Sequence, residues 1–290
     1  MALSDKFKSF ASQRSRNVLR PYAYFLFRGW FLARSRLGYA GTAPSFIIIG
    51  TQKGGTTTLY EALCAHSRIV SARTKEISFF DRYFDLGKKW YLANFPDLSG
   101  TDKITGEATP DYMFGSQVPE RVEQVLGRDV KFIVLLRDPL SRSVSQYFHE
   151  YRLGTETAPI EEAFALEESR LEGNPDQRTG PRLENLTNRF SFGYRERSRY
   201  AKQLQPWFDR FGRRSFYIET SENFFDNPNK VRDEVIEFLG LKPEPLPEIK
   251  ARNVGTYGAK VPPELYSRLE KELEDERRQM NELIKETRYQ

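Results

Sequence analysis

The sequence predicts an α/β protein whose core is a doubly wound parallel sheet with helices on both faces. Short apolar runs at 46–49 and 130–136 have the composition of strands buried on both faces, and a third strand is expected at 215–218. A helical pattern follows each of these strands. Alternation of strands and helices favours a parallel sheet with crossover helices.

The elements between the first two strands follow from their flanking residues. The first helix begins at Thr56, and its apolar side runs through Leu59 and Leu63. Pro110 favours extended geometry at the residue before it, and a proline is favoured early in a helix. We therefore expect, in order, an extended segment at 75–81, a helix at 87–94, a loop at 106–112 and a helix at 119–126.

The second half of the chain continues the alternation. The strand at 130–136 ends at Arg137-Asp138-Pro139 and leads into a helix at 140–153. A glycine at position 240 should end a helix at 227–239. The other expected elements are an exposed loop at 173–182, a helix at 198–211 and a charged final helix that starts near Pro262.

The basic charge of the chain is concentrated at its N-terminus. Residues 1–36 contain eight basic residues and one acidic residue, whereas the remainder contains 37 basic and 39 acidic residues. We therefore expect a basic, aromatic arm at 1–42 and a single domain at 43–290. The slightly acidic body argues against nucleic acid as a partner. A single cysteine excludes an internal disulfide, so we expect a cytoplasmic protein.

The aromatic run at 22–33 leaves two alternatives for the arm. Arg28 interrupts this run, which is too short to span a bilayer and lacks a signal-peptide cleavage site. A basic segment with aromatic anchors can lie on an anionic membrane surface, here the inner surface. The alternative is a helix that packs on the body through its aromatic side chains.

The segment 45–60 predicts an anion site. A buried strand ends at Gly50, and a turn containing Lys53 leads into a helix. Glycines allow a tight turn and close approach of the backbone, and a helix N-terminus with a lysine beside it favours an anion. The lysine precedes the glycines, whereas it follows them in a Walker P-loop. The fold is therefore P-loop-like, without the fingerprint of a nucleoside triphosphatase. The residues expected to bind are Lys53, Gly54, Gly55, Thr56, Thr57 and Thr58.

A second anion site is expected after the strand at 130–136. Arg137 directly follows that strand, and Ser145 lies in the helix behind it, with Arg142 as a further candidate. Arginine can give paired N–H donors to a phosphate. Carboxyl ends of parallel strands lie at one edge of a sheet, so Lys53 and Arg137 should share one site.

These segments resemble sulfotransferases that use 3′-phosphoadenosine 5′-phosphosulfate (PAPS). Residues 51–59 look like the 5′-phosphosulfate loop of that family, and residues 132–147 look like its 3′-phosphate motif. Residues 75–81 and 90–96 are similar to segments of the heparan sulfate group and its bacterial relatives. The resemblance covers roughly residues 44–286.

The resemblance implies roles for the residues of both motifs. Lys53 would neutralise charge on the leaving oxygen, and the backbone at 54–57 would hold the 5′-phosphate and sulfonate. Arg137 and Ser145 would hold the 3′-phosphate. A late loop of the family, which closes over the nucleotide, matches Arg252, Tyr257 and Lys260. No metal is implied.

The resemblance also implies a general base, with two departures from the family pattern. The family glutamate falls on Glu76, but the histidine common near it is Ser78 here, and the lysine of the next motif is Ala108. His149 is the rival base. An arginine-rich segment at 194–200 either holds an acidic acceptor or faces solvent.

The expected reaction is transfer of a sulfuryl group from PAPS to a hydroxyl or amine of a carbohydrate, a glycolipid or another hydroxyl compound. One alternative is a P-loop-like small-molecule kinase in which Asp138 holds Mg²⁺. The other is a non-enzymatic module that binds anions or a lipid surface.

Overall fold

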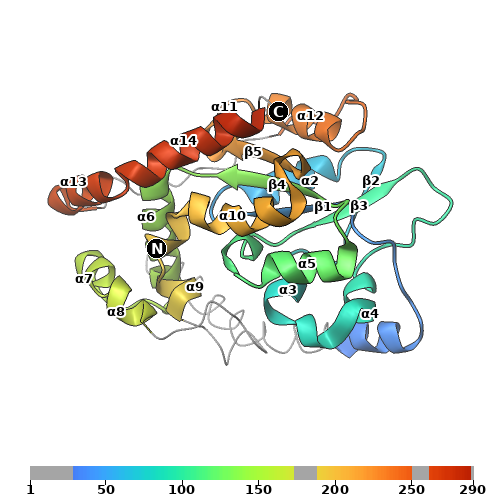
Figure 1. The fold of residues 1–290 in the computed structure, drawn as a ribbon, viewed down its shortest axis with the longest axis horizontal. Helices are drawn as coiled ribbons and strands as arrows, with labels where there is room; N and C mark the ends of the chain where they lie inside the picture. The colour runs from blue at the N-terminus through green and yellow to red at the C-terminus, as the bar shows by residue number, and fades with distance from the viewer. Residues whose placement is uncertain (1–28, 173–187, 250–260, 289–290) are drawn as a thin grey trace, which may run out of the picture.

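A five-stranded parallel sheet forms the centre of the computed structural model, which describes residues 29–172, 188–249 and 261–288 (Figure 1). The strand order is β2-β3-β1-β4-β5. The strands are β1 (Phe46–Gly50), β2 (Ile69–Ser71), β3 (Ile104–Ala108), β4 (Lys131–Leu136) and β5 (Phe216–Thr220). Every pairing is parallel, which confirms the predicted fold class.

The central strand β1 lies at the point where the chain changes direction across the sheet. From β1 the chain adds β3 and β2 on one side, and it then adds β4 and β5 on the other. Register pairs Phe46 with both Gly106 and Lys131. Ligands bind at such reversal points, beyond the carboxyl ends of the strands. The loops after β1 and β4 are therefore neighbours.

Helices cover both faces of the sheet, and every residue of β1 is buried. Ile47 and Ile49 face one core, while Phe46 and Ile48 face the other. The first core includes side chains from α3 (Phe79–Arg82), α4 (Gly87–Leu92), α5 (Val118–Leu126), α10 (Tyr200–Phe211) and α14 (Glu274–Arg288). The second includes side chains from α2 (Thr56–Leu63), α11 (Ser221–Asp226) and α12 (Pro228–Phe238).

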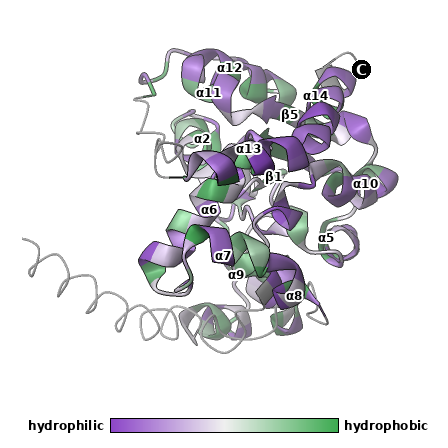
Figure 2. Cartoon of the chain, turned by 90° about the vertical axis from the view of Figure 1, so that its left-hand side faces the viewer, coloured by the Kyte–Doolittle hydropathy of each residue, from purple (hydrophilic) through white to green (hydrophobic). Residues whose placement is uncertain are grey.

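A third apolar cluster lies beyond one end of the sheet. It joins α6 (Pro139–Leu153) and α7 (Ile160–Ala165) to α13 (Pro263–Glu272). Figure 2 looks onto this part and colours α13 largely as hydrophilic, whereas α6 and α9 contain hydrophobic residues. The remaining elements are α8 (Glu167–Leu171), α9 (Asn188–Phe192) and the short 3-10 turns η1 (Phe84–Leu86), η2 (Tyr112–Phe114), η3 (Glu196–Ser198) and η4 (Arg213–Ser215).

Three sequence expectations were wrong. The segment at 106–112 begins as a strand, because β3 reaches Ala108. A glycine is needed inside β3, since a Cβ at Gly106 would lie 2.4 Å from the Phe46 ring. Residues 79–82 are helical instead of extended, and the final helix breaks at Leu273. The loop expected at 173–182 lies outside the described residues.

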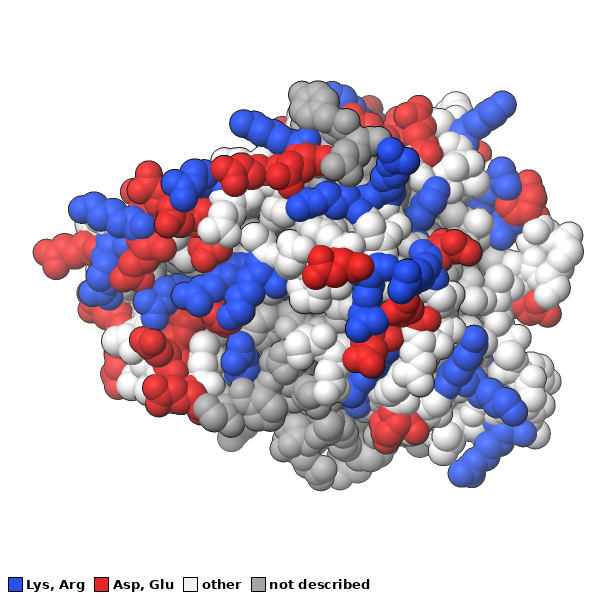
Figure 3. Space-filling model, viewed as in Figure 1, with Lys and Arg blue, Asp and Glu red and all other residues white. Residues whose placement is uncertain are grey.

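Lys and Arg side chains are interspersed with Asp and Glu over the face shown in Figure 3. Charges of mixed sign are typical of a solvated surface. Within the residues that the structure describes, no helix has both the length and the apolar character needed to cross a bilayer.

Candidate active site

The loop after β1 is held by the neighbouring strand. The Thr51 N–H donates to the Leu135 carbonyl of β4 at 2.8 Å, and the Gly54 N–H donates to the Thr51 carbonyl at 2.9 Å. Lys53 has a φ of 72°, in the left-handed region. The loop therefore turns tightly between β1 and α2, and its shape depends on contact with β4.

Both glycines of the loop are required by the space around them. A Cβ at Gly54 would lie 2.7 Å from the Leu135 carbonyl oxygen. Gly55 has a φ of 93°, and a Cβ there would lie 2.8 Å from the Phe225 ring. Real Cβ contacts are longer than this, so a side chain would displace the loop. The glycines let this backbone pack closely against β4 and α11 at the start of α2.

The N-terminus of α2 is open to an anion. Its N-cap is Gly55, which has no side chain that could cap the first N–H groups. Thr56 is buried at the first helical position, whereas Thr57 and Thr58 are partly exposed. Unpaired N–H groups and the helix dipole favour a phosphate or sulfate at this place.

The electrostatics of Lys53 agree with an anion site. Burial lowers the pKa of the Lys53 ammonium, and the positive charges of Arg152 and Arg137 lower it further. The negative charge of Glu150 acts in the opposite direction. Three cations that repel one another gain free energy when an anion binds among them.

Arg137 joins the second predicted motif to this loop. It directly follows β4, is 8% exposed, and its Nη1 donates to the Lys53 carbonyl at 3.3 Å. The Tyr200 hydroxyl donates to the Arg137 carbonyl at 2.7 Å and so fixes the backbone. Ser145 lies on α6 and is 2% exposed. The two motifs, which are distant in sequence, thus lie at one edge of the sheet.

The segment that carries Glu76 reaches the same edge from β3. The Glu76 N–H donates to the Ala108 carbonyl at 3.2 Å, and β3 is the neighbour of β1. The Glu76 side chain is 49% exposed and pairs with the Lys75 ammonium at 3.0 Å. Glu76 and Ser78 both have left-handed backbones, with φ of 57° and 52°. The candidate base is therefore an exposed, ion-paired carboxylate on a constrained segment.

The remaining predicted site residues are His149 and the three residues of the late loop. His149 is half-buried in the last turns of α6, between the Phe148 and Glu150 positions. Arg252, Tyr257 and Lys260 lie outside the described residues, so their expected contact with a nucleotide stays a prediction.

Arg142 is not part of the site. It is fully buried, and its guanidinium donates to Ser198 Oγ at 2.6 Å and to Gln146 Oε1 at 2.7 Å. Burial lowers its pKa to about 10. These internal partners show that Arg142 joins α6 to the η3 turn, a role that its place in the motif did not reveal.

The arginine-rich segment 194–200 is also largely internal. Arg197 is 3% exposed and binds Asp111 at 2.5 Å, while its guanidinium lies over the Phe114 ring. Arg195 pairs with Glu167 at 2.9 Å and with Glu272 at 2.8 Å. For Arg197 both expectations, an acceptor site and a solvated face, are therefore wrong, because its guanidinium is buried and paired inside the protein.

Asp138 caps a helix. Its carboxylate accepts from the Ser141 N–H at 2.9 Å at the start of α6, and it pairs with Arg277 at 2.8 Å. These bonds occupy the carboxylate that the kinase alternative requires for Mg²⁺. An Asp followed by Pro at the start of a helix is a known capping pattern, so the sequence already contained this signal.

Sequence reasoning missed two residues at the loop after β1: Thr51 within the loop and Ser221 of α11, which contacts it. The Ser221 hydroxyl donates to the Gly54 carbonyl at 2.9 Å from the start of α11. The Thr51 hydroxyl is buried and has no hydrogen-bond partner within the described residues. Ser221 follows β5 as Lys53 follows β1, and this shared position at a strand end was the available signal.

The comparison with family models matches residues 43–280 to the sulfotransferase domain. Human heparan sulfate glucosamine 3-O-sulfotransferase 3B1 is 34% identical over 200 residues, which cover 69% of this chain and 46% of that protein. The membrane-associated sulfotransferase kil1 of Dictyostelium discoideum is 28% identical, with 73% and 59% covered. The chain thus spans about half the length of the curated relatives it matches.

A solved structure with the same fold supports the family. The sulfotransferase from Alicyclobacillus acidocaldarius superposes with a TM-score of 0.64 at 25% identity and covers 84% of this chain and 96% of its own. The sequence match, the shared fold and the two loops at one sheet edge agree. The chain belongs to the sulfotransferase domain family.

Proposed function

We propose that this protein transfers a sulfuryl group from PAPS to a hydroxyl or amine of an acceptor. The observation that carries this proposal is the contact between the two anion-binding loops, where Arg137 donates to the Lys53 carbonyl at 3.3 Å. Two anion sites at one sheet edge suit a nucleotide that carries phosphate at both its 5′ and 3′ positions. A donor with a single phosphate group would leave one of the two sites without a ligand.

The donor would lie across the carboxyl ends of β1 and β4. The N–H groups at the start of α2, with the hydroxyls of Thr56 and Thr57, would bind the 5′-phosphate and the sulfonate. Arg137 and Ser145 would bind the 3′-phosphate. Bonds from donors to a charged oxygen are the stronger kind of hydrogen bond, so these groups can discriminate PAPS from adenosine 5′-phosphosulfate.

The reaction needs one bond made, one bond broken and one proton moved. The acceptor oxygen attacks the sulfur, and the bond from sulfur to the bridging phosphate oxygen breaks. Lys53 stabilises the negative charge that develops on that oxygen, and adenosine 3′,5′-bisphosphate leaves. Glu76 takes the proton of the acceptor hydroxyl. Since lysine, arginine and the helix N-terminus supply the positive charge, we expect no metal requirement.

The ion pair at Glu76 imposes a condition on the base. The Lys75 ammonium lies 3.0 Å from Glu76 Oε1 and so occupies an oxygen that the acceptor hydroxyl would otherwise contact. Acceptor binding has to separate these groups or exclude water from them. An acceptor that carries its own anionic groups can draw Lys75 away from Glu76, which favours an acidic carbohydrate as the substrate.

The names of the relatives indicate the acceptor class. Several of them are named as sulfotransferases that act on the glucosamine of heparan sulfate. We propose a carbohydrate or glycolipid acceptor on this basis. Heparan sulfate is therefore the first acceptor to try, beside a glycolipid and a simple phenol.

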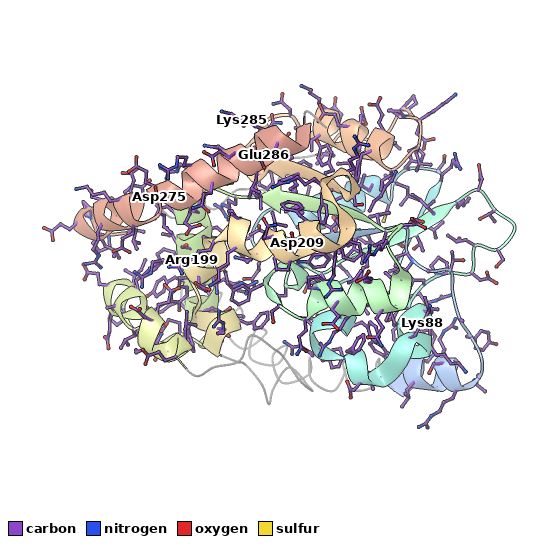
Figure 4. All side chains as sticks on the ribbon, viewed as in Figure 1. Lys88, Arg199, Asp209, Asp275, Lys285 and Glu286 are labelled. Carbon is purple, nitrogen blue, oxygen red and sulfur yellow. The ribbon has the colours of Figure 1, made fainter. Side chains whose placement is uncertain are left out.

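Transfer of labelled sulfate tests the proposal. The full chain is incubated with [³⁵S]PAPS and each acceptor, and Lys53→Ala is compared with Lys88→Ala. Lys88 is exposed on α4, at the edge of the molecule (Figure 4). We expect Lys53→Ala to lower kcat by about 10²–10³-fold, while Lys88→Ala retains activity. Absence of label transfer to every acceptor, with intact PAPS binding, would point to the non-enzymatic module.

A further proposal concerns the arm. Residues 29–36 are helical, and Phe31 packs on the body against Trp90 with ring centroids 6.4 Å apart. Trp30, Leu37 and Tyr39 are 47%, 75% and 55% exposed. Arg34 lies between the Trp30 and Tyr39 rings, at 4.8 and 4.7 Å. Phe31 therefore supports packing of the arm on the body, and the exposed residues support contact with a membrane surface.

We propose that the exposed residues contact an anionic membrane surface, as exposed tryptophan, tyrosine and arginine are suited to that interface. The Dictyostelium relative is named as membrane-associated. Sedimentation with phosphatidylserine vesicles should fall for the double variant Trp30→Ala and Tyr39→Ala. The control Tyr266→Ala removes an exposed aromatic of α13 and should leave sedimentation unchanged. Equal sedimentation of both variants and the parent would contradict the membrane contact.

A further inference from the structure

A buried carboxylate lies behind the segment that carries Glu76. Glu107 is fully buried in β3, within the sheet. Its Oε1 accepts from the Tyr91 hydroxyl at 2.6 Å, and its Oε2 accepts from the Thr109 hydroxyl at 2.9 Å. The Tyr112 hydroxyl lies 3.4 Å from both oxygens. Three hydroxyl groups therefore orient their protons toward one carboxylate.

Two of these hydroxyls accept from the backbone next to Glu76. The Tyr112 hydroxyl accepts from the Phe79 N–H at 2.8 Å and the Phe80 N–H at 3.4 Å. The Thr109 hydroxyl accepts from the Ser78 N–H at 3.5 Å. A hydroxyl that accepts from an N–H must direct its own proton elsewhere, and here the proton points to Glu107. The carboxylate thus acts on the backbone at 78–80 through one intervening residue.

The backbone that these bonds hold is strained. Glu76 and Ser78 have φ of 57° and 52°, a left-handed region that residues with a side chain rarely adopt. The following helix, α3, has four residues, and no side chain of Ser78 caps it. Such a conformation persists only where its surroundings determine it. The surroundings here are the Ala108 carbonyl, Thr109 and Tyr112.

We propose that Glu107 is a positioning residue for Glu76: it orients Tyr112 and Thr109, which hold the segment at 76–80. This inference rests on the proposed function, in which Glu76 is the general base. A base must lie within hydrogen-bond reach of the acceptor proton, so loosening of this segment lowers the rate of chemistry without weakening donor binding.

The chemistry of Glu107 itself agrees with this role. Burial raises its pKa to about 7, the bonds from Tyr91 and Thr109 act in the opposite direction, and the charge of Asp81 on α3 raises it further. The other titratable groups that interact with it are hydroxyls, on Tyr60 of α2, Tyr91 of α4 and Tyr112. Near neutral pH an ionised group here costs folding free energy that a glutamine would not cost. In the proposed role, this folding cost is offset because the carboxylate holds the backbone at 76–80 in place.

Hydrogen exchange tests the positioning directly and needs no acceptor. Amide exchange is measured for the peptide that covers 76–82 in the parent, Glu107→Gln and Tyr112→Phe. The control is Tyr217→Phe on β5, which removes a bond of 2.7 Å to Glu234 of α12, remote from the segment. We expect exchange at 79–80 to accelerate at least tenfold in both test variants and to stay unchanged in the control. Unchanged exchange in Tyr112→Phe and in Glu107→Gln would overturn the inference.

Kinetics with [³⁵S]PAPS and heparan sulfate separate positioning from a general loss of stability. We expect kcat to fall about tenfold or more in Glu107→Gln and Tyr112→Phe, with the KM for PAPS within twofold of the parent. A rise in that KM with unchanged kcat would contradict the role. Full activity of Glu76→Gln would overturn the proposed base instead, and the exchange result would distinguish the two failures.

Discussion

The proposed donor loop at 51–58 and the proposed base segment at 75–82 lie at the same sheet edge, yet they are built differently. The donor loop is held by the Leu135 carbonyl of β4, 2.8 Å from the Thr51 N–H, and by the Ser221 hydroxyl of α11, 2.9 Å from the Gly54 carbonyl. Glycines at 54 and 55 make this contact possible. The base segment has no glycine, and Tyr112, Thr109 and Glu107 hold it from behind.

The difference teaches which part of the site is local in sequence. A loop of glycines and backbone bonds needs a fixed short pattern, because any side chain would collide with its neighbours. A segment held by distant side chains needs a matching set of partners spread over 91–112. The first arrangement suits a common donor, and the second allows the acceptor side to differ among relatives.

The largest expected effect separates the two regions by function. Glu76→Gln should lower kcat by about 10²–10⁴-fold, the usual contribution of a general base, with binding of adenosine 3′,5′-bisphosphate unchanged. Glu120→Gln, an exposed glutamate on α5, is the control. Isothermal titration and sulfate transfer measure the two quantities. Near-normal turnover would move the role of base to His149.

A second prediction tests the steric basis of the donor loop. Gly54→Ala places a Cβ 2.7 Å from the Leu135 carbonyl oxygen, so we expect a loss of about 1–3 kcal/mol in the free energy of unfolding. Binding of adenosine 3′,5′-bisphosphate should fall as well. Gly29→Ala, where a Cβ would have no atom of the described residues within 4 Å, should leave both quantities intact. Chemical denaturation and calorimetry are the measurements, and a parent-like Gly54→Ala would show that the loop tolerates a side chain.

The third prediction concerns pH and the base segment. Glu107 has a folded-state pKa of about 7, above the ordinary value of 4.5. Its protonated form therefore stabilises the folded state below pH 4.5, and that contribution is lost as pH rises to 7. Removing the carboxyl as Glu107→Gln should abolish this component, on the order of 2 kcal/mol. Urea denaturation of both proteins between pH 5 and 8 measures it; parallel curves would contradict the assigned pKa.

The smallest expected effect refines the donor side. Ser145→Ala should weaken adenosine 3′,5′-bisphosphate by about 1 kcal/mol, or roughly fivefold in Kd, and leave adenosine 5′-phosphate unchanged. Ser141→Ala, exposed on the same helix, should change neither Kd. Equal weakening of both nucleotides would place Ser145 away from the 3′-phosphate.

The contact between the loop at 51–58 and Arg137 was predictable because its signals are local. The strand, the glycines, Lys53 and the position of Arg137 after a strand follow from short patterns and one rule about parallel sheets. The buried network was not predictable. Glu107 in β3 has the appearance of a loop residue beside Gly106, Thr109 and Pro110. Its burial follows from tertiary contacts with Tyr91 and Tyr112, which no short pattern contains.

Two arginines were candidates for anion binding and instead have partners inside the protein. Arg142 and Arg197 lie in segments whose sequence suggests an anion site. In the structure the Arg142 guanidinium binds Ser198 and Gln146, and the Arg197 guanidinium binds Asp111. Sequence alone gives the residue type and its element, whereas the partner depends on where α6 and the η3 turn meet. The family resemblance correctly identified the fold and the class of protein before the structure was considered.

The most direct test of the central claim is a comparison of two nucleotides on the intact protein. Thermal unfolding is recorded with adenosine 3′,5′-bisphosphate and, separately, with ADP and Mg²⁺. A donor with phosphate at both ends predicts that the bisphosphate raises Tm by several degrees and that Arg137→Ala removes most of this rise. Stabilisation by ADP with Mg²⁺ alone would contradict the account.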